Sequence, residues 1–210
     1  MNWATAASLA TAAGTLVLAI ATFVSVRSAN RAARTAERTL LAGIRPLLVP
    51  SRPQDPEQKI GFMDDRWIKV PGGQAAIDVG DDAIYLVMSV RNVGSGLAVM
   101  HGWRFFPERV LGTGDDHPPL EEFHRLSRDI YVPSGELGFW QGAFRDPTDP
   151  AFAAVGDATK ARQPMTVDLL YGDYEGGQRV ISRFAVIPVG EDRWLATVSR
   201  HWNLDRPDPR

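Results

Sequence analysis

The sequence has one cluster of side chains with the chemistry of a metal site, between residues 115 and 124. Histidine nitrogens and carboxylate oxygens are ligands that zinc and manganese accept. His117 and His124 could approach each other if the segment forms a turn and a short helix, in which Glu121 would share a face with His124. Pro118-Pro119 and the abundant charge are equally typical of a solvated loop. We therefore predict no metal site, and keep His117, Glu121 and His124 as candidate ligands of an alternative metal-binding or hydrolytic domain.

Motifs for nucleophilic catalysis and for phosphate-binding loops are absent from the sequence. The chain has no cysteine, which excludes disulfides, thiolate zinc sites and thiol catalysis. Gly94-Ser95-Gly96 lacks the strand-to-helix context of a nucleophilic serine and is predicted to be a turn. His101 lies between Val99 and Trp103 on the apolar face of a predicted strand, where a hydrogen-bonded structural histidine is expected. These patterns favour a protein with no catalytic residue, no cofactor and no enzymatic activity.

The composition is that of a globular protein with a basic beginning and an acidic remainder. Of the 210 residues, 44% are hydrophobic and 23% charged, and the net charge is −2, which argues against nucleic-acid binding. Residues 1–45 contain five arginines and one glutamate, whereas the remaining residues contain 18 basic and 24 acidic side chains. This asymmetry indicates that the two parts of the chain contact different surroundings.

An uncharged segment at the N-terminus is long enough to cross a membrane. No charged residue occurs from Trp3 to Val26, and a helix of that length spans about 36 Å against a hydrocarbon core of about 30 Å. A signal peptide would carry positive charge before its apolar run, and Ala19-Ile20-Ala21 lies inside the run rather than after it. We predict a transmembrane helix over residues 1–26, with an exported domain behind a signal peptide as a second alternative.

Residues 27–45 predict a basic juxtamembrane helix that continues the span and ends near Gly43 and Pro46. Its arginines recur every three or four residues, and they contact either anionic lipid or solvent. Because every basic residue near the span follows it, the positive-inside rule places the N-terminus outside and the C-terminal domain in the cytoplasm of a plasma membrane. The membrane-proximal basic residues are Arg27, Arg31, Arg34 and Arg38.

Small residues also recur along the predicted span. Ala6, Ala10 and Gly14 are spaced four residues apart, so that they share one helix face. Such a face lets a second helix approach closely and favours a homodimer through the transmembrane helix. In an alanine-rich helix the same spacing also arises by chance.

Beyond Pro46 the sequence predicts a mainly β domain. Short apolar runs alternate with turn signals and no strand–helix repeat occurs, which favours an immunoglobulin-like antiparallel β-sandwich over residues 46–205, followed by a tail at 206–210. Short helices are expected at Pro118–Arg125 and Pro150–Val155. The predicted strands are Pro46–Ser51, Arg66–Val70, Ala75–Val79, Ala83–Arg91, Leu97–Phe105, Asp129–Val132, Leu137–Phe144, Met165–Tyr171, Val180–Val189 and Trp194–Ser199.

Three short motifs accompany this layout. They are Ala-Gly-Ile-Arg-Pro at Ala42–Pro46, Arg-Asn-Val-Gly-Ser-Gly at Arg91–Gly96, and Arg-His-Trp at Arg200–Trp202. With the span and the basic stem, the chain resembles uncharacterised single-pass, membrane-anchored β-sandwich proteins of high-GC actinobacteria. The resemblance implies a bacterial plasma membrane and a β-sandwich, and it implies no activity and no catalytic residue.

Taken together, the sequence predicts a non-enzymatic single-pass membrane protein that presents a cytoplasmic β-sandwich for interaction. The expected partners are the lipid bilayer and a protein, and nucleic acid is not expected.

Overall fold

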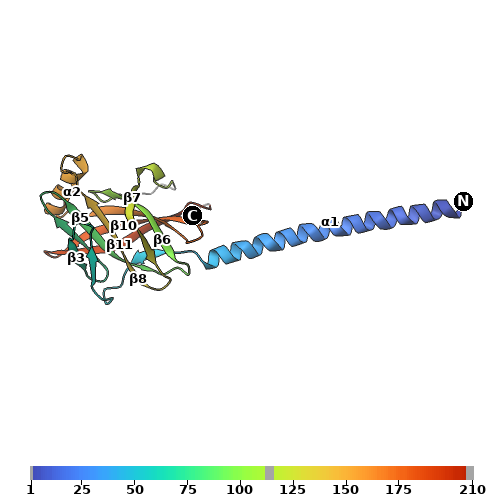
Figure 1. Ribbon diagram of the computed structural model, residues 1–210, viewed down its shortest axis with the longest axis horizontal. Helices are drawn as coiled ribbons and strands as arrows, with labels where there is room; N and C mark the ends of the chain where they lie inside the picture. Colours follow the sequence, from blue (N-terminus) through green and yellow to red (C-terminus); the bar gives the residue numbers. More distant parts are fainter. Residues whose placement is uncertain (1, 112–115, 207–210) are drawn as a thin grey trace. The chain divides into compact units, whose positions relative to one another are not determined.

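The computed structural model describes residues 2–111 and 116–206, and the chain divides into two compact units, Met1–Gly43 and Ile44–Arg210. The first unit is the helix α1, Trp3–Gly43, drawn in blue in Figure 1. The predicted span and the predicted basic stem are thus parts of one unbroken helix. It ends at Gly43, where the sequence predicts a helix stop.

The side chains of α1 are those of a helix that can lie in lipid. Large apolar residues such as Leu16, Leu18 and Phe23 are more than half exposed. Hydroxyl groups donate back into the helix, as in the bond of 2.8 Å from Thr22 Oγ1 to the Leu18 carbonyl, which satisfies them without water. By length and composition Ala7–Leu41 could cross a membrane, a test that a signal sequence near the N-terminus also passes.

The second unit, called the body below, is built from strands. Its helical elements are the single 3₁₀ turn η1, Leu120–Glu122, and the helix α2, Pro150–Lys160. The strands are β1 (Leu48–Pro50), β2 (Gln58–Gly61), β3 (Trp67–Val70), β4 (Gln74–Val79), β5 (Ile84–Asn92), β6 (Ala98–Phe106), β7 (His124–Val132), β8 (Leu137–Phe144), β9 (Met165–Gly172), β10 (Arg179–Val189) and β11 (Arg193–Asn203). The prediction of a mainly β fold behind one long N-terminal helix is confirmed.

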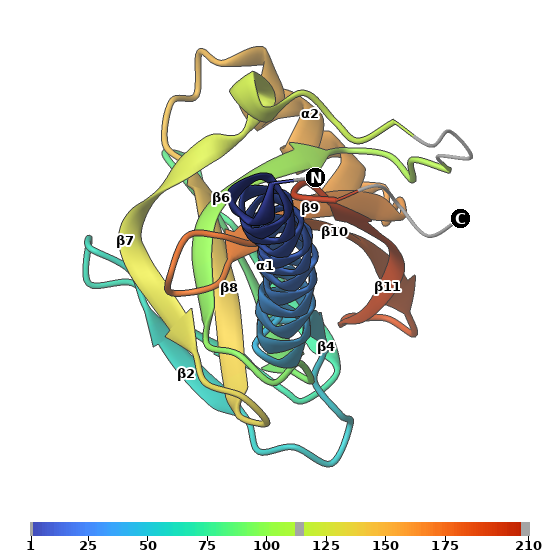
Figure 2. The ribbon, with the colours of Figure 1, turned by 90° about the vertical axis from the view of Figure 1, so that its right-hand side faces the viewer.

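Within the described residues, nine strands form one antiparallel sheet. Its order is β1-β5-β4-β11-β10-β9-β6-β7, and β8 pairs with β5 as well. Figure 2 shows this sheet curving through the body, with β7 and β11 on opposite sides of the view. β2 and β3 form a separate hairpin. The division into two sheets that defines an immunoglobulin-like sandwich is not confirmed, because the strands are joined continuously.

The curved sheet stops between β7 and β8. These strands follow each other in the chain, yet among the described residues they share no ladder of hydrogen bonds. At the loop end of this join, Val132 packs so closely on Gly138 that an added Cβ on the glycine would lie 2.5 Å from a valine methyl. We call the join between β7 and β8 the seam.

The main core fills the inside of the curved sheet. Trp140, Tyr171 and Phe184 are its largest fully buried side chains. The helix α2, capped by the Asp149 carboxylate on the Ala151 amide, adds Val155 to it. A second cluster lies under the β2–β3 hairpin, and a third covers the outer face of β9 and β10 with Trp202, so that every residue of β9 is buried.

Several predicted elements differ from the structure. β2 was not expected, because Gln-Lys-Ile-Gly carries little strand signal. The helix expected at Pro118–Arg125 is only the turn η1, since β7 begins at His124. The predicted apolar face of β6 is wrong at His101, because a register shift between Met100 and Gly102 reverses the alternation there.

Candidate functional site

The four predicted membrane-proximal arginines lie on α1 and are exposed, and none forms an ion pair within the described part of the chain. At 3.6 residues per turn they fall within a sector of about 60°. The same sector carries Leu16 and Ile20, about three and two turns before Arg27. One side of α1 therefore changes from large apolar to cationic residues near Arg27, as expected where a helix leaves a hydrocarbon core.

The three candidate metal ligands lie in different structural elements: His117 in a loop, Glu121 in η1 and His124 in β7. His117 is exposed, with Nδ1 2.8 Å from the Pro118 carbonyl oxygen, and Glu121 is exposed on η1. His124 is the first residue of β7, and the centroid of its ring lies 4.9 Å from that of Trp103. No group of three His, Cys, Asp or Glu side chains that could hold a metal occurs among residues 2–111 and 116–206. Asp115, which begins the predicted cluster, lies outside the described residues.

His124 instead belongs to a cavity of about 190 Å³ at the open part of the seam. We call it the seam cavity. Trp103 of β6, only 6% exposed, lies at its inner side, and the turn between β2 and β3 covers it. The lining residues are Phe62, Met63, Trp103, His124, Arg125, Leu126, Gln141, Gly142, Ala143 and Arg145.

The polar lining of the seam cavity consists of hydrogen-bond donors. Arg128 reaches across the seam and donates to Gln141 Oε1 at 2.7 Å, with its guanidinium 5.3 Å from the Phe139 ring. Arg125 makes no hydrogen bond or ion pair with any described residue. Arg145 Nε lies 3.4 Å from the Asp64 carboxylate. The cavity therefore combines two guanidinium groups, an imidazole and an amide, without an acidic residue in its lining.

Asp64 is the nearest acidic group, and it has other partners. Its carboxylate accepts a hydrogen bond of 2.5 Å from the Tyr85 hydroxyl. This bond, with a smaller contribution from Arg145, lowers the pKa of Asp64, and the same bond raises the pKa of Tyr85. Asp64 is thus charged at neutral pH and offsets part of the charge of Arg145, but not that of Arg125.

A second hollow of about 330 Å³ lies on the other side of Arg125, where β7 bulges away from β6. Met100 pairs with Ile130 and Gly102 with Arg125, so that His101 on β6 and residues 126–129 on β7 lie between these pairs without a partner in the β6–β7 register. His101 lines this hollow with Asp129 and Arg179. Burial, with the nearby charge of Arg179, lowers the pKa of His101. The structural hydrogen bond expected for His101 is not made with any described residue.

The predicted Gly94-Ser95-Gly96 turn lies against the backbone of Ile44 and Arg45, the first two residues of the body. Added Cβ atoms on Gly94 and Gly96 would lie 2.3 Å from the Arg45 oxygen and 1.7 Å from the Ile44 oxygen. Only glycine permits this approach. We call this region, with the loop that follows Asn92, the Ile44 end.

The side chains of Asn92 and Arg45 stabilise the Ile44 end through hydrogen bonds. Asn92 is fully buried: its Oδ1 accepts from the amides of Leu47 and Gly94, and its Nδ2 donates to the carbonyls of Gly96 and Val132. Arg45 donates to Asn203, the last residue of β11, and to Asp205, two residues after it. The motifs at Ala42–Pro46 and Arg91–Gly96 therefore meet in space. They have a structural role here, which their separation in the sequence does not reveal.

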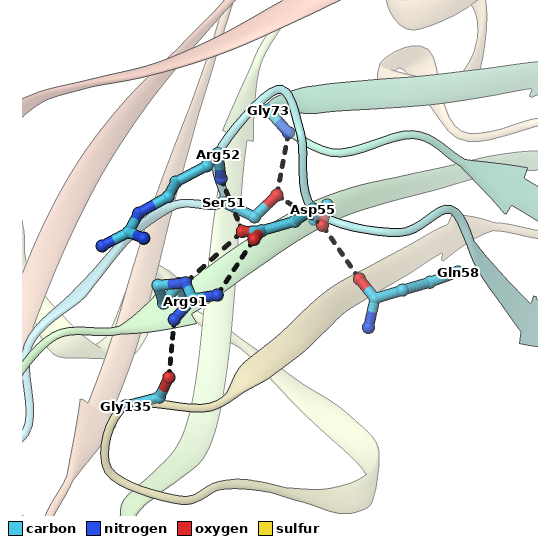
Figure 3. A network of polar contacts seen from close by, with 8 residues as sticks. Ser51, Arg52, Asp55, Gln58, Gly73, Arg91 and Gly135 are labelled. Carbon is cyan, nitrogen blue, oxygen red and sulfur yellow. Dashed lines mark hydrogen bonds and ion pairs between the residues drawn. The ribbon is translucent and has the colours of Figure 1, made fainter.

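A neighbouring network, shown in Figure 3, holds the loop between β1 and β2. Arg91 donates to both oxygens of Asp55, and also to the Gly135 carbonyl at 2.7 Å. Ser51 Oγ accepts from the Gly73 amide at 2.8 Å and donates to Ser89 Oγ at 2.7 Å. Hydrogen bonds from the Arg52 amide and Arg91 lower the pKa of Asp55. Each donor meets an acceptor of the body itself, which is typical of a structural network.

Two buried polar arrangements lie in the β9–β10–β11 region and were not predicted. Asp168 and Arg183 are opposite each other on β9 and β10 and form a two-bond ion pair of 2.7 and 2.8 Å. Tyr171, Ser182 and His201 form a chain of hydrogen bonds of 2.7 and 2.6 Å. Burial raises the pKa of Tyr171 to about 12. A signal for the ion pair is present in the sequence, since one acid and one base face each other across the predicted hairpin.

No family model matches this chain, and comparisons with curated proteins and with solved structures find no match either. The function is therefore argued from the molecule alone.

Proposed function

We propose that this protein is a single-pass protein of a bacterial plasma membrane, with its N-terminus outside and its body in the cytoplasm. The observation that carries the proposal is α1: a helix of 41 residues whose apolar side chains are exposed and which bears no charge before Arg27. Exposed apolar surface of this extent is stable in lipid rather than in water.

The arginines of α1 support the orientation. Four positive charges follow the uncharged run at its C-terminal end. Basic residues next to a span are retained on the cytoplasmic side, where each contributes about 1 kcal/mol of attraction to anionic lipid. The lipid bilayer is thus the first partner that we propose.

We propose further that the body binds a protein partner and catalyses no reaction. The body has its own core, so it can be presented by α1 as a separate unit. An immunoglobulin-like sandwich stays our prediction for its fold class, and the acidic excess outside α1 argues against nucleic acid as the partner.

Single cysteines test the orientation, because the natural chain has none. In separate variants, Asn2→Cys and Ser199→Cys place a thiol at exposed positions on the two sides of the proposed span. We expect a membrane-impermeant maleimide to label Asn2→Cys in intact cells and Ser199→Cys only after lysis. The reverse result would contradict the orientation, and loss of the N-terminal residues from the mature chain would show an exported domain instead.

Ser51→Cys serves as the folding control in the same experiment. Ser51 is 4% exposed and hydrogen bonded within the body, so its thiol should react only after denaturation. Labelling of Ser51→Cys in gently lysed cells would mean that the body had unfolded, and it would disqualify the Ser199→Cys result from that preparation.

A further inference from the structure

The seam cavity lies where the curved sheet is left open between β7 and β8. β8 pairs along its length with β5, and β7 pairs with β6, but β7 and β8 do not pair with each other. At the closed part of the seam, Val132 packs on Gly138. At the open part, side chains border an accessible cavity instead of a ladder.

Gln141 presents an unused donor to this cavity. Gln141 is 6% exposed, and its Oε1 accepts a hydrogen bond from Arg128, whose guanidinium can only donate. The two N–H groups of Nε2 then have no partner among the described residues. Nε2 is not among the fully buried atoms that lack a partner, so it is accessible at the cavity and can donate to a ligand there.

Arg125 is the second unused donor. It borders both the seam cavity and the hollow beside His101, which Asp129 also lines, and it forms no ion pair with any described residue. His124, next to it, is held against the Trp103 ring. Donors from two strands, β7 and β8, therefore converge on one cavity, and Arg145 adds a second positive charge from beyond β8.

We propose that the seam cavity binds a small oxyanion, a carboxylate or a phosphate, whose oxygens accept hydrogen bonds from Arg125 and from Gln141 Nε2. The group is supplied either as a free anion or at the end of a partner's side chain. Guanidinium and amide N–H groups complement these oxygens, and charge-assisted hydrogen bonds of this kind are among the stronger ones in proteins. The inference goes beyond the proposed function, and it holds on whichever side of the membrane the body lies.

The size and lining of the cavity select this class of ligand. Its volume of about 190 Å³ is smaller than the roughly 300 to 1,000 Å³ of sites for whole small molecules. A carboxylate or phosphate fits, whereas a nucleotide or an acyl chain does not. Without an acidic residue in the lining, the cavity offers nothing to a cation.

Isothermal titration of the full chain in detergent micelles tests the proposal, with inorganic phosphate and acetate as the first probes. We expect saturable binding with a dissociation constant of about 1 mM or below for one of them. Arg125→Gln should weaken that binding about 10- to 100-fold, because it removes a charge-assisted bond. Arg109→Gln is the matched control, since Arg109 is exposed, borders neither cavity and should leave the binding unchanged.

Gln141→Glu separates loss of binding from loss of the fold. The new carboxylate keeps an acceptor for Arg128 while replacing the N–H donors with negative charge. We expect the variant to keep its unfolding midpoint and to lose binding of the anion. Unchanged binding in Gln141→Glu or in Arg125→Gln would overturn the assignment of the site.

Blocked pentapeptides with a single glutamate or phosphoserine identify the source of the anion, each compared with its alanine counterpart. Tighter binding of an anionic peptide than of acetate or phosphate supports a partner's side chain, and binding of the free anions alone supports a soluble anion. If neither the free anions nor the peptides bind at 10 mM, a concentration about tenfold above the expected constant, the proposal is wrong.

Discussion

Two buried amide side chains, on neighbouring strands of the same sheet, illustrate two uses of polar groups in this protein. Asn92, at the end of β5, makes four hydrogen bonds to the backbone of the Ile44 end. Gln141, in the middle of β8, makes one, to Arg128. A fully satisfied amide fixes a local structure, whereas an accessible amide with free donors can bind a ligand. The Ile44 end is therefore interpreted as structural and the seam cavity as a binding site.

The largest expected effect is the loss of Asn92. Asn92→Leu leaves four backbone groups of the Ile44 end without partners, and we expect it to lower the free energy of unfolding by about 3–5 kcal/mol. Gln141→Leu removes one hydrogen bond and should cost about 1 kcal/mol. Urea unfolding of the full chain in micelles, followed by near-ultraviolet circular dichroism, compares them. Equal losses would remove the distinction between the two amides.

The glycines of the Ile44 end give a second, smaller effect. Gly96→Ala places a Cβ against the Ile44 carbonyl, and displacing that backbone should cost about 2–3 kcal/mol. Gly135→Ala is the control: its φ is +75° but the space around it is open, so only the strained backbone conformation is penalised, by about 1 kcal/mol. The same unfolding measurement applies, and a greater loss in Gly135→Ala would contradict the close approach of Ile44 to the turn.

Acid should loosen the network of Figure 3 before it affects the seam. The pKa of Asp55 is lowered in the folded protein by the Arg52 amide and by Arg91, so its contribution to stability is present above the unfolded value of about 3.9 and is lost as pH falls through the lower, folded value. The protection of the β1–β2 loop amides against hydrogen exchange, corrected for the intrinsic exchange rate at each pH, should therefore fall below about pH 4. Asp55→Asn should remove this pH dependence, and if the dependence persists, another carboxylate holds the loop.

The smallest expected effect on stability is at the seam cavity. Arg125 is exposed and unpaired, so Arg125→Gln should change the free energy of unfolding by less than about 0.5 kcal/mol, although it should weaken anion binding. A thermal scan without added anion measures the first effect. A loss above 1 kcal/mol would mean that Arg125 supports the fold, and the contrast with Asn92 would fail.

Much of the fold is predictable from local patterns. The uncharged run before Arg27 and the stop at Gly43 predict α1, and alternation from Ala83 to Arg91 predicts β5. Sequence reasoning failed where a tertiary contact overrides the pattern. The bulge opposite His101 depends on the pairing of β6 with β7, and the sequence of neither strand predicts it.

The candidate site was predicted only in one residue. His124 was selected for its proximity in sequence to His117 and Glu121, but its neighbours in the structure are Trp103 and Arg125. The cavity is bordered by three strands and two loops, and its lining residues lie between positions 62 and 145. Spacing along the chain carries no information about such a set.

The sequence by itself determined most of the helices and strands, although not β2 or the start of β7 at His124. It also determined where charge first appears beside the span and that no cysteine chemistry is available, because these properties depend on residues within a few positions of one another. The tertiary structure alone decided that β7 and β8 do not pair among the described residues, that the Asn92 side chain is fully hydrogen bonded, and that Gln141 Nε2 and Arg125 have no hydrogen-bond partner in the described part of the chain. The physical reason is that hydrogen-bond satisfaction is a property of pairs of groups brought together by folding, and the partner of each group lies tens of residues away.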